Sequence, residues 1–153
     1  MRILAIDYGD TRTGFAISDA LNITAQGLAT IRNNGDDKVL LRKIDEFLSI
    51  YEISNIVVGM PYNMNGTPSK RMEQTEKFIH KLKCKYNKIK IDFIDERLTT
   101  VTAHKTMNYL EINKHKKRDI VDTISAVYIL EMYMEKIKKK WNYIKLWLNF
   151  KII

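Results

Sequence analysis

The sequence predicts an α/β fold, with a mixed five-stranded sheet and helices on its faces. Three short apolar segments follow one another at the start of the chain, at residues 3–8, 14–19 and 23–31. Such a succession is typical of antiparallel strands joined by turns. From about residue 36 onward, helix and strand patterns alternate. That alternation favours helices packed against a sheet, and the predicted order of elements is βββαβαβαα.

The middle of the chain contains two amphipathic helix patterns and two apolar strand patterns, at residues 41–51, 56–61, 69–86 and 89–94. Asp36 or Asp37 stands where a helix N-cap is expected before the first of these helices. Asn, Gly and Pro fill residues 62–68, which predicts a loop between the first of these strands and the second helix.

The last part of the predicted domain contains two helices separated by a basic segment. Thr99 or Thr100 caps a short helix that reaches Tyr109, and residues 114–118 are expected to form a basic loop. Asp119 is predicted to cap a longer helix, whose apolar stripe continues to Ile137.

The length of 153 residues suits one domain, predicted over residues 1–135, followed by a tail at residues 136–153. No apolar run is long enough to span a membrane, and the start of the chain does not resemble a signal peptide. Cys84 is the single cysteine and has no evident histidine partner, which argues against a disulfide or a catalytic thiol. A reducing cytoplasmic location is expected.

The net charge of +8 is concentrated at the end of the chain. Six lysines and no acidic residue occupy residues 136–153, so the body is only mildly basic. A basic excess favours polyanionic partners such as nucleic acid or anionic lipid, without choosing between them.

The tail is predicted to be helical, because Ile137, Trp141, Ile144 and Leu148 recur at helical spacing. Its many aromatic residues predict that part of it is buried, either on its own domain or on a second copy. Contact with a membrane surface or with RNA is the alternative. The chain is therefore expected to be a monomer or a homodimer.

Three carboxylates are predicted to meet at one edge of the sheet. Asp7 and Glu96 follow strand patterns, and Asp122 lies in the first turn of the last predicted helix of the domain. Ligands bind at the carboxyl ends of strands in open α/β sheets. Converging acids repel one another unless a cation lies between them, and oxygen ligands without His or Cys suit Mg²⁺ or Mn²⁺. Such ions support phosphodiester hydrolysis.

Four segments, taken in order, resemble the motifs of the YqgF/RuvX family. They are Asp-Tyr-Gly-Asp-Thr-Arg-Thr-Gly-Phe-Ala-Ile-Ser-Asp at 7–19, Gly-Met-Pro at 59–61 with Gly66, Asp-Glu-Arg-Leu-Thr-Thr at 95–100, and Val-Asp-Thr-Ile-Ser-Ala at 121–126. The resemblance covers about residues 1–135. It implies an RNase H-like fold and a nuclease, described for the family both as a Holliday junction resolvase and as an enzyme that matures the 5′ end of pre-16S rRNA.

The resemblance also implies roles for individual residues. It assigns the catalytic, metal-binding carboxylates to Asp7, Glu96 and Asp122. Asp119 stands three residues before Asp122, where the family would have a basic residue, so it is either a fourth ligand or a helix cap. Residues expected to contact the nucleic acid, or to orient the acids, are Arg12, Arg97, Thr100, Lys116, Lys117 and Arg118.

Simpler structural explanations exist for several of these residues. Asp7 could bond to the backbone of its own turn, and Asp122 could be favoured by the helix dipole alone. Arg12 could pair with Asp10 or Asp19 instead of a phosphate. The basic segment 114–118 could simply be a solvated run of charge.

The sequence leaves three classes of function to compare. A metal-dependent nuclease acting on structured RNA is favoured, with branched DNA as the alternative substrate, which would require a two-fold dimer. A phosphotransferase would need a second domain of this kind, for which 153 residues leave no room. A non-catalytic RNA-binding factor in ribosome assembly would gain little from three acids facing phosphates.

Overall fold

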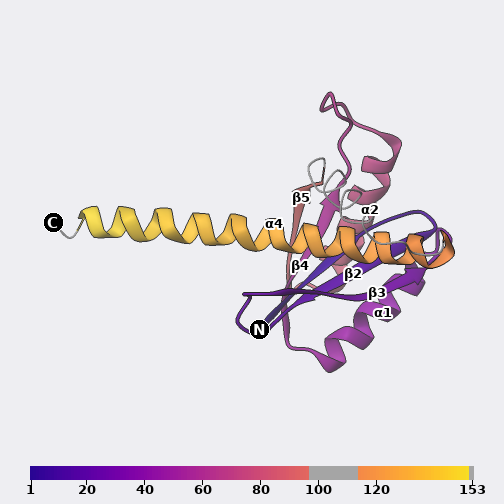
Figure 1. Ribbon diagram of the computed structural model, residues 1–153, viewed down its shortest axis with the longest axis horizontal. Helices are drawn as coiled ribbons and strands as arrows, with labels where there is room; N and C mark the ends of the chain where they lie inside the picture. The colour runs from indigo at the N-terminus through magenta and orange to yellow at the C-terminus, as the bar shows by residue number, and fades with distance from the viewer. Residues whose placement is uncertain (97–113, 152–153) are drawn as a thin grey trace.

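The computed structural model describes residues 1–96 and 114–151, with residues 114–119, 146 and 149–151 described by their backbone. Its elements, labelled as in Figure 1, are β1 (Arg2–Asp7), β2 (Arg12–Ser18), β3 (Ala25–Arg32), α1 (Asp37–Ile50), β4 (Ile53–Met60), α2 (Lys70–Lys85), β5 (Lys90–Asp95) and α4 (Lys114–Lys151). The predicted helix at residues 100–109 lies outside the described residues.

The five strands form one mixed sheet in the order β3-β2-β1-β4-β5. The first three strands are antiparallel neighbours, whereas β1, β4 and β5 run parallel. The predicted five-stranded mixed sheet is therefore confirmed. Because β1, β4 and β5 are parallel, their carboxyl ends lie along one edge of the sheet.

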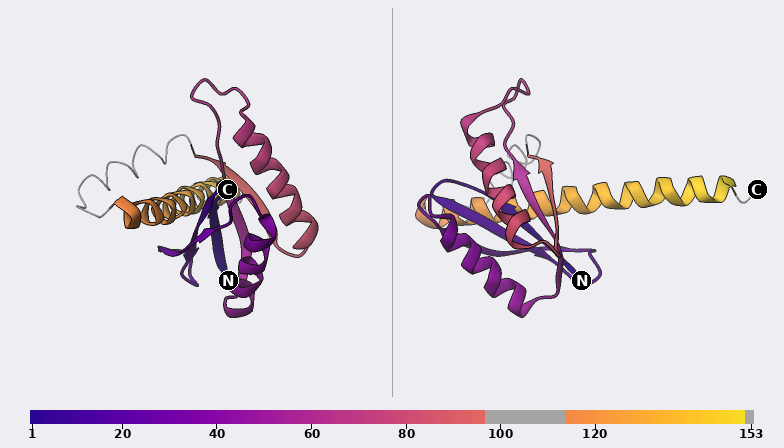
Figure 2. Two further views of the ribbon diagram at one scale, coloured as in Figure 1. Left: turned by 90° about the vertical axis from the view of Figure 1, so that its right-hand side faces the viewer. Right: turned by 180° about the vertical axis from the view of Figure 1, so that it is seen from behind.

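Helices cover both faces of the sheet. The sheet separates α4 from α1 and α2, as the left view of Figure 2 shows. Side chains alternate along the central strand: Leu4 and Ile6 belong to the apolar cluster that includes α1 and α2, whereas Ile3 and Ala5 belong to the cluster that includes α4. This period-two alternation is the pattern expected of a strand buried on both faces.

Side-chain caps fix the starts of α1 and α2. The Asp36 carboxylate accepts a hydrogen bond from the Lys38 backbone N–H at 2.9 Å, which confirms Asp36 as the N-cap of α1. The Ser69 hydroxyl accepts one from the Met72 N–H at 3.1 Å and donates to the Pro61 carbonyl at 3.3 Å. Ser69 thereby holds the start of α2 next to the end of β4.

Glycines let α4 approach the sheet closely. A Cβ on Gly14 would overlap the backbone carbonyl of Asp122, and one on Gly27 would overlap the methyl group of Thr123. The approach is reinforced by a hydrogen bond of 2.7 Å between the hydroxyls of Thr123 and Thr30. Gly14 and Gly27 lie on the neighbouring strands β2 and β3. Because neither has a side chain, residues 122 and 123 of α4 can pack close to the backbone of the sheet.

The long helix α4 begins earlier than the sequence predicts. It runs without interruption from Lys114 to Lys151, so the predicted basic loop at residues 114–118 is wrong. The prediction that Asp119 caps the helix is wrong for the same reason, because Asp119 lies inside it. Nothing in the sequence forbids an earlier start, since lysine and arginine are good helix formers.

The end of α4 projects beyond the domain, as Figure 1 shows. Ile137 still packs against the core, but Trp141, Tyr143 and Trp147 are exposed. The prediction that these aromatic residues are buried on their own domain is therefore wrong. A helix of 38 residues is about 57 Å long, whereas five strands span only about 24 Å, so the helix must leave the sheet.

The structure corrects one further sequence-based statement. The Sγ atom of Cys84 lies 3.6 Å from Nε2 of His80, one turn earlier on α2, so the cysteine does have a histidine neighbour. Cys84 is exposed. Among the helices described, none combines the length and apolar character needed to cross a membrane.

Candidate active site

Asp7 and Glu96 meet at the carboxyl edge of the sheet. Asp7 is the last residue of β1, and Glu96 directly follows β5, with β4 lying between these two strands. The Glu96 backbone N–H donates to the Met60 carbonyl at 3.2 Å, which fixes the start of the next segment against β4. The two carboxyl groups share a hydrogen bond.

Gly59 makes this meeting possible. It lies on the intervening strand, paired with Ile94 and one residue after Val58, the partner of Ile6. A Cβ on Gly59 would lie 2.5 Å from Oε2 of Glu96. A side chain at this position would therefore displace the Glu96 carboxylate. The absence of a side chain at Gly59 leaves the space that this carboxylate occupies next to Asp7.

Both carboxyl groups are held where ionisation is unfavourable. Burial raises the pKa of Asp7 well above its ordinary value, and the neighbouring Glu96 charge raises it further. Burial likewise raises the pKa of Glu96. Two acids this close and this poorly solvated are stabilised by sharing a proton or by binding a cation.

Arg71 is a functional candidate that the sequence analysis missed. It lies in the first turn of α2, is exposed, and its charge lowers the pKa of both Asp7 and Glu96. No motif or spacing singles it out, because it belongs to an ordinary helix start. The Ser69 cap places this turn beside the end of β4 and so brings Arg71 to the acids.

Asp122 approaches the same site from α4, but its carboxylate has a partner. Oδ2 of Asp122 lies 3.0 Å from Nε of Arg12, and each side chain is about four-fifths buried. The Asp122 charge contributes to raising the pKa of Asp7, so the two acids are within electrostatic range. The ion-pair partner of Arg12 is thus Asp122, and not Asp10 or Asp19, the two alternatives considered from the sequence.

The structure does not describe the side chains of the other predicted site residues. Arg97 and Thr100 lie outside the described residues. Lys116, Lys117, Arg118 and Asp119 are described by their backbone, which places them in the first two turns of α4. The helix thus brings these positions toward the end of the sheet at which Asp122 meets Gly14.

The carboxylate oxygens of Asp7 and Glu96 suit a divalent cation, although they do not form a complete coordination shell. Among the side chains that the structure describes, no three acidic, His or Cys groups are close enough together to surround a metal. Asp7 and Glu96 nevertheless offer hard oxygen ligands, as Mg²⁺ and Mn²⁺ require. Burial is the main cause of their raised pKa values, and a bound cation would offset the cost of ionising both groups there.

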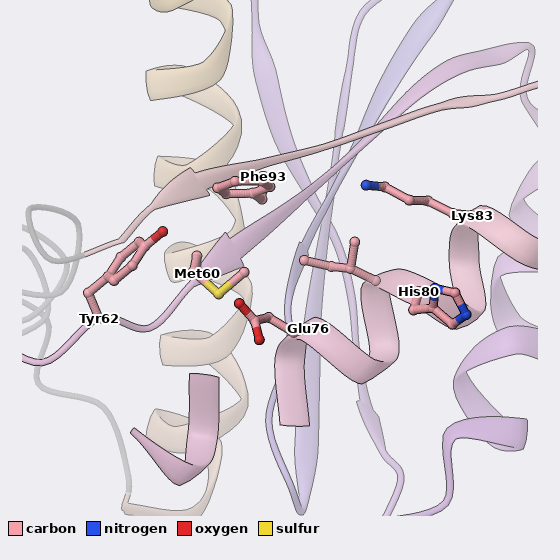
Figure 3. Close-up of a pocket in the computed structure, with 7 residues that line it drawn as sticks. Met60, Tyr62, Glu76, His80, Lys83 and Phe93 are labelled. Atoms are coloured by element: carbon pink, nitrogen blue, oxygen red, sulfur yellow. The ribbon is translucent and has the colours of Figure 1, made fainter. Parts of the chain in front are cut away.

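A hollow of about 300 Å³ lies close by, on the other side of the sheet. Figure 3 shows its lining side chains, contributed by α2 and the ends of β4 and β5, among them Met60, Tyr62, His80, Lys83 and Phe93. Met60 belongs to the apolar cluster of the α1 and α2 face. The hollow is therefore separate from the carboxyl groups of Asp7 and Glu96.

Comparison with known proteins gives this arrangement a family. The family model described as "RuvX: Holliday junction resolvase" matches residues 1–136. The chain belongs to the RuvX family. The match includes every strand of the sheet and the part of α4 that packs on it, and it ends where the helix leaves the domain.

Curated relatives from two bacteria support membership of the RuvX family. A protein of Ruminiclostridium cellulolyticum named "Putative pre-16S rRNA nuclease" is 50% identical over 139 residues, which are 90% of this chain and 96% of the relative. One of the same name from Acetivibrio thermocellus is 47% identical over 135 residues, covering 88% and 96%.

The fold of this RuvX chain is also found in a solved resolvase structure. A fowlpox virus resolvase, crystallised with Holliday junction DNA, superposes with a TM-score of 0.56 at 15% identity. The superposition covers 90% of this chain and 99% of the viral protein. At this level of identity the likeness concerns the fold, and it confirms the predicted RNase H-like architecture.

Proposed function

We propose that this protein is a metal-dependent nuclease that hydrolyses phosphodiester bonds in the 5′ region of pre-16S rRNA. The observation that carries the proposal is the buried pair of carboxyl groups, Asp7 and Glu96, at the carboxyl edge of the sheet. Burying two acids side by side is costly unless a shared proton, a positive partner or a bound metal ion offsets their charge. The names of the RuvX relatives suggest the RNA substrate.

In this proposal Asp7 and Glu96 hold Mg²⁺ or Mn²⁺, with Asp122 as a further ligand and Asp119 as a possible fourth. The bound cation would lower the pKa of a water molecule and stabilise the charge of the leaving oxygen. The protein supplies the fixed positions of the acids. Gly59 leaves room for the Glu96 carboxylate, and the hydrogen bond from the Glu96 N–H to Met60 limits its movement.

Arg12 and Arg71 are the arginines that we propose as contacts for the phosphate backbone. Arg71 is exposed and lies within electrostatic range of both acids. Nε of Arg12 lies 3.0 Å from Oδ2 of Asp122. We propose that the Arg12 guanidinium orients Asp122 and adds positive charge that favours a phosphate at this edge of the sheet. Arg97, Thr100, Lys116, Lys117 and Arg118 extend this proposed contact surface.

The test compares cleavage of two substrates by the same preparations. One is a transcript of the 5′ region of the 16S rRNA precursor, and the other is a synthetic four-way DNA junction. The wild type should cleave the transcript with added Mg²⁺ or Mn²⁺ and lose activity with a chelator. Asp7→Asn should lose at least about 100-fold in rate, whereas Asp10→Asn, in the adjoining turn, should keep it.

Branched DNA is the second candidate substrate, favoured by the description of the RuvX family model. Symmetric cleavage of a four-way junction requires two active sites related by a two-fold axis. Preferential cleavage of the junction, by a protein that sediments as a dimer, would establish this alternative. A protein that binds the transcript but cleaves neither substrate would instead support the non-catalytic assembly factor and would overturn the nuclease proposal.

A further inference from the structure

The part of α4 beyond Ile137 carries an apolar stripe with no partner in the chain as described. Trp141, Ile144 and Leu148 form the stripe, and their side chains are 66%, 40% and 47% exposed. We call residues 138–151 the α4 extension. Large apolar residues that recur on one exposed face of a helix indicate an interaction surface more often than chance exposure.

The stripe continues the face of α4 that packs on the sheet. Leu130 and Met134 are buried there, and Ile137 packs at the edge. From Leu130 to Leu148 the apolar positions follow one another at intervals of four, three, four, three and four residues. This spacing keeps a seam on one side of a helix and is used when two helices pack side by side.

The borders of the stripe are basic. Lys140 lies on one side of it and Lys145 on the other, and Lys138 adds a third positive charge near the same border as Lys145. The last acidic residue of the chain is Glu135, which pairs with Lys139 at 2.8 Å. Any partner of the stripe must therefore come close to an uncompensated row of positive charge.

We propose that the α4 extension is a docking helix for another protein, one that presents an apolar helical stripe bordered by Asp and Glu. Such a partner would bury Trp141, Ile144 and Leu148 in a two-helix seam. Its acidic borders would pair with Lys140 and Lys145. Opposite charges at the borders of a seam select the partner and its orientation.

A second copy of this chain does not meet these requirements. Parallel or antiparallel pairing of two α4 extensions would place lysines opposite lysines on both borders of the seam. Like charges at such positions destabilise a helix pair. The stripe is thus suited to packing against a helix, while its borders select against a helix of its own sequence.

The shape of the molecule disfavours a membrane, and the composition of the stripe disfavours RNA. The stripe continues the sheet-facing side of α4, so the domain lies on the side toward which it points, as Figure 2 shows. A flat bilayer approaching that side would meet the domain first. Lysines and tryptophans could contact RNA, but Ile144 and Leu148 have no charge or hydrogen-bonding group for a phosphate or a base edge.

Docking at the α4 extension is separate from the proposed nuclease site. Before the helix leaves the sheet, the Tyr133 hydroxyl donates to Asp92 on β5 at 3.1 Å and accepts from Asn55 near the start of β4 at 3.4 Å. The extension therefore departs from the end of the parallel strands opposite Asp7 and Glu96. A partner bound there would leave the carboxyl groups accessible.

The two tryptophans of the chain, Trp141 and Trp147, both lie in the α4 extension, so their fluorescence reports on it directly. The probes are two synthetic 21-residue amphipathic peptides with leucine along the seam, one with glutamate borders and one with lysine borders. Titrated into the full-length protein, the glutamate peptide should shift tryptophan emission to shorter wavelength. The lysine peptide should bind at least about tenfold more weakly.

A charge-reversal pair of variants tests the selectivity. Lys140→Glu/Lys145→Glu should reverse the preference, so that the lysine peptide binds more tightly. Lys136→Glu/Lys139→Glu makes the same change in net charge outside the borders of the stripe, and it should keep the preference for the glutamate peptide. Neither pair touches the proposed nuclease site, so cleavage of the rRNA transcript should be unchanged in both.

Several outcomes would overturn the docking proposal and leave the proposed function intact. One is the absence of any shift with the glutamate peptide, and another is an equal response to both peptides. A shift produced by duplex RNA or by anionic phospholipid vesicles, but not by the peptide, would assign the extension to those partners. A blue shift of the protein alone that grows with its concentration would indicate pairing between copies.

Discussion

Arg12 and Asp122 form an ion pair of 3.0 Å that joins β2 to α4 beside the two buried acids. The residues are 110 positions apart in the chain, and their contact depends on Gly14, which allows the Asp122 backbone to reach the sheet. Each side chain is mostly buried, so the pair is poorly screened by solvent. It thus links the position of α4 to the geometry of the proposed active site.

The first prediction concerns the energy of this pair. A double-mutant cycle with Arg12→Met and Asp122→Asn should give a coupling energy of about 1 to 3 kcal/mol, because each single change leaves a poorly solvated charge without its partner. The exposed pair between Lys139 and Glu135 is the control, and its coupling energy should be clearly smaller because solvent screens the two charges. Chemical denaturation followed by circular dichroism measures both. Equal coupling in the two cycles would contradict the prediction.

The second prediction concerns pH. Burial raises the pKa of Asp7 above its ordinary value of 3.8, so the folded protein retains a proton that the unfolded chain releases. The Asp7 carboxyl group therefore lowers the free energy of unfolding as the pH rises from about 3.8 to the raised pKa, and the loss persists above it. Asn at this position does not titrate.

Without metal, Asp7→Asn should accordingly be more stable than the wild type at pH 7.5, by about 1 to 3 kcal/mol. The difference should shrink as the pH falls toward 4. Unfolding in a chelating buffer at a series of pH values measures it, with Asp10→Asn as the control. A wild type that is more stable than the variant at pH 7.5 would show that Asp7 is satisfied without a cation.

The third prediction tests whether the missing side chains of Gly27 and Gly14 allow α4 to pack close to the sheet. Gly27→Ala should destabilise the protein by about 1 to 3 kcal/mol, because its Cβ would overlap the methyl group of Thr123. Thr123→Ser removes that methyl group and keeps the hydroxyl that contacts Thr30. The double variant should recover most of the loss.

Gly14→Ala is the contrasting case, because its Cβ would meet the backbone carbonyl of Asp122. No substitution at Asp122 removes a backbone oxygen, so Thr123→Ser should not rescue this variant. Thermal unfolding of the single and double variants compares the two sites. Rescue of both glycine variants, or of neither, would show that the close approach has been assigned to the wrong atoms.

The fourth prediction concerns Arg71. If this residue receives the substrate phosphate, Arg71→Ala should raise the KM for the rRNA transcript by about 10- to 100-fold, the value of a hydrogen bond to a charged group. Lys70→Ala, in the same exposed turn, should change KM less than about threefold, and Arg71→Lys should restore part of the loss. If Arg71→Ala and Lys70→Ala raise KM equally, Arg71 contributes only general positive charge and does not bind a specific phosphate.

Much of the fold follows from the sequence because local pattern and burial agree there. The strand ending at Asp7, the cap at Asp36 or Asp37 and a helix starting near residue 69 can be predicted, since each depends on neighbours in the chain. The start of α4 cannot be predicted in the same way. Asp119 resembles an N-cap, and only the backbone shows that the helix has already begun.

The candidate site could be predicted in part, for a related reason. Acids at strand ends are common, so Asp7 and Glu96 stand out because they belong to an ordered set of four motifs, and the structure brings these two residues together. Arg71 is an ordinary residue at a helix start and becomes notable only when the sheet edge is assembled. The exposure of Trp141 also depends on tertiary structure, because the width of the sheet decides how much of a long helix is covered.

The position of α4 at the C-terminal end of the described chain has a consequence for synthesis on the ribosome. All five strands emerge before the helix that covers one face of the sheet. A nascent chain that stops short of Ala126 would leave Ala5, Ala16 and Val57 without their helical cover. Asp122, the ion-pair partner of Arg12, lies on this same final helix. The proposed ribonuclease would therefore stay inert toward the RNA around it until translation is nearly finished.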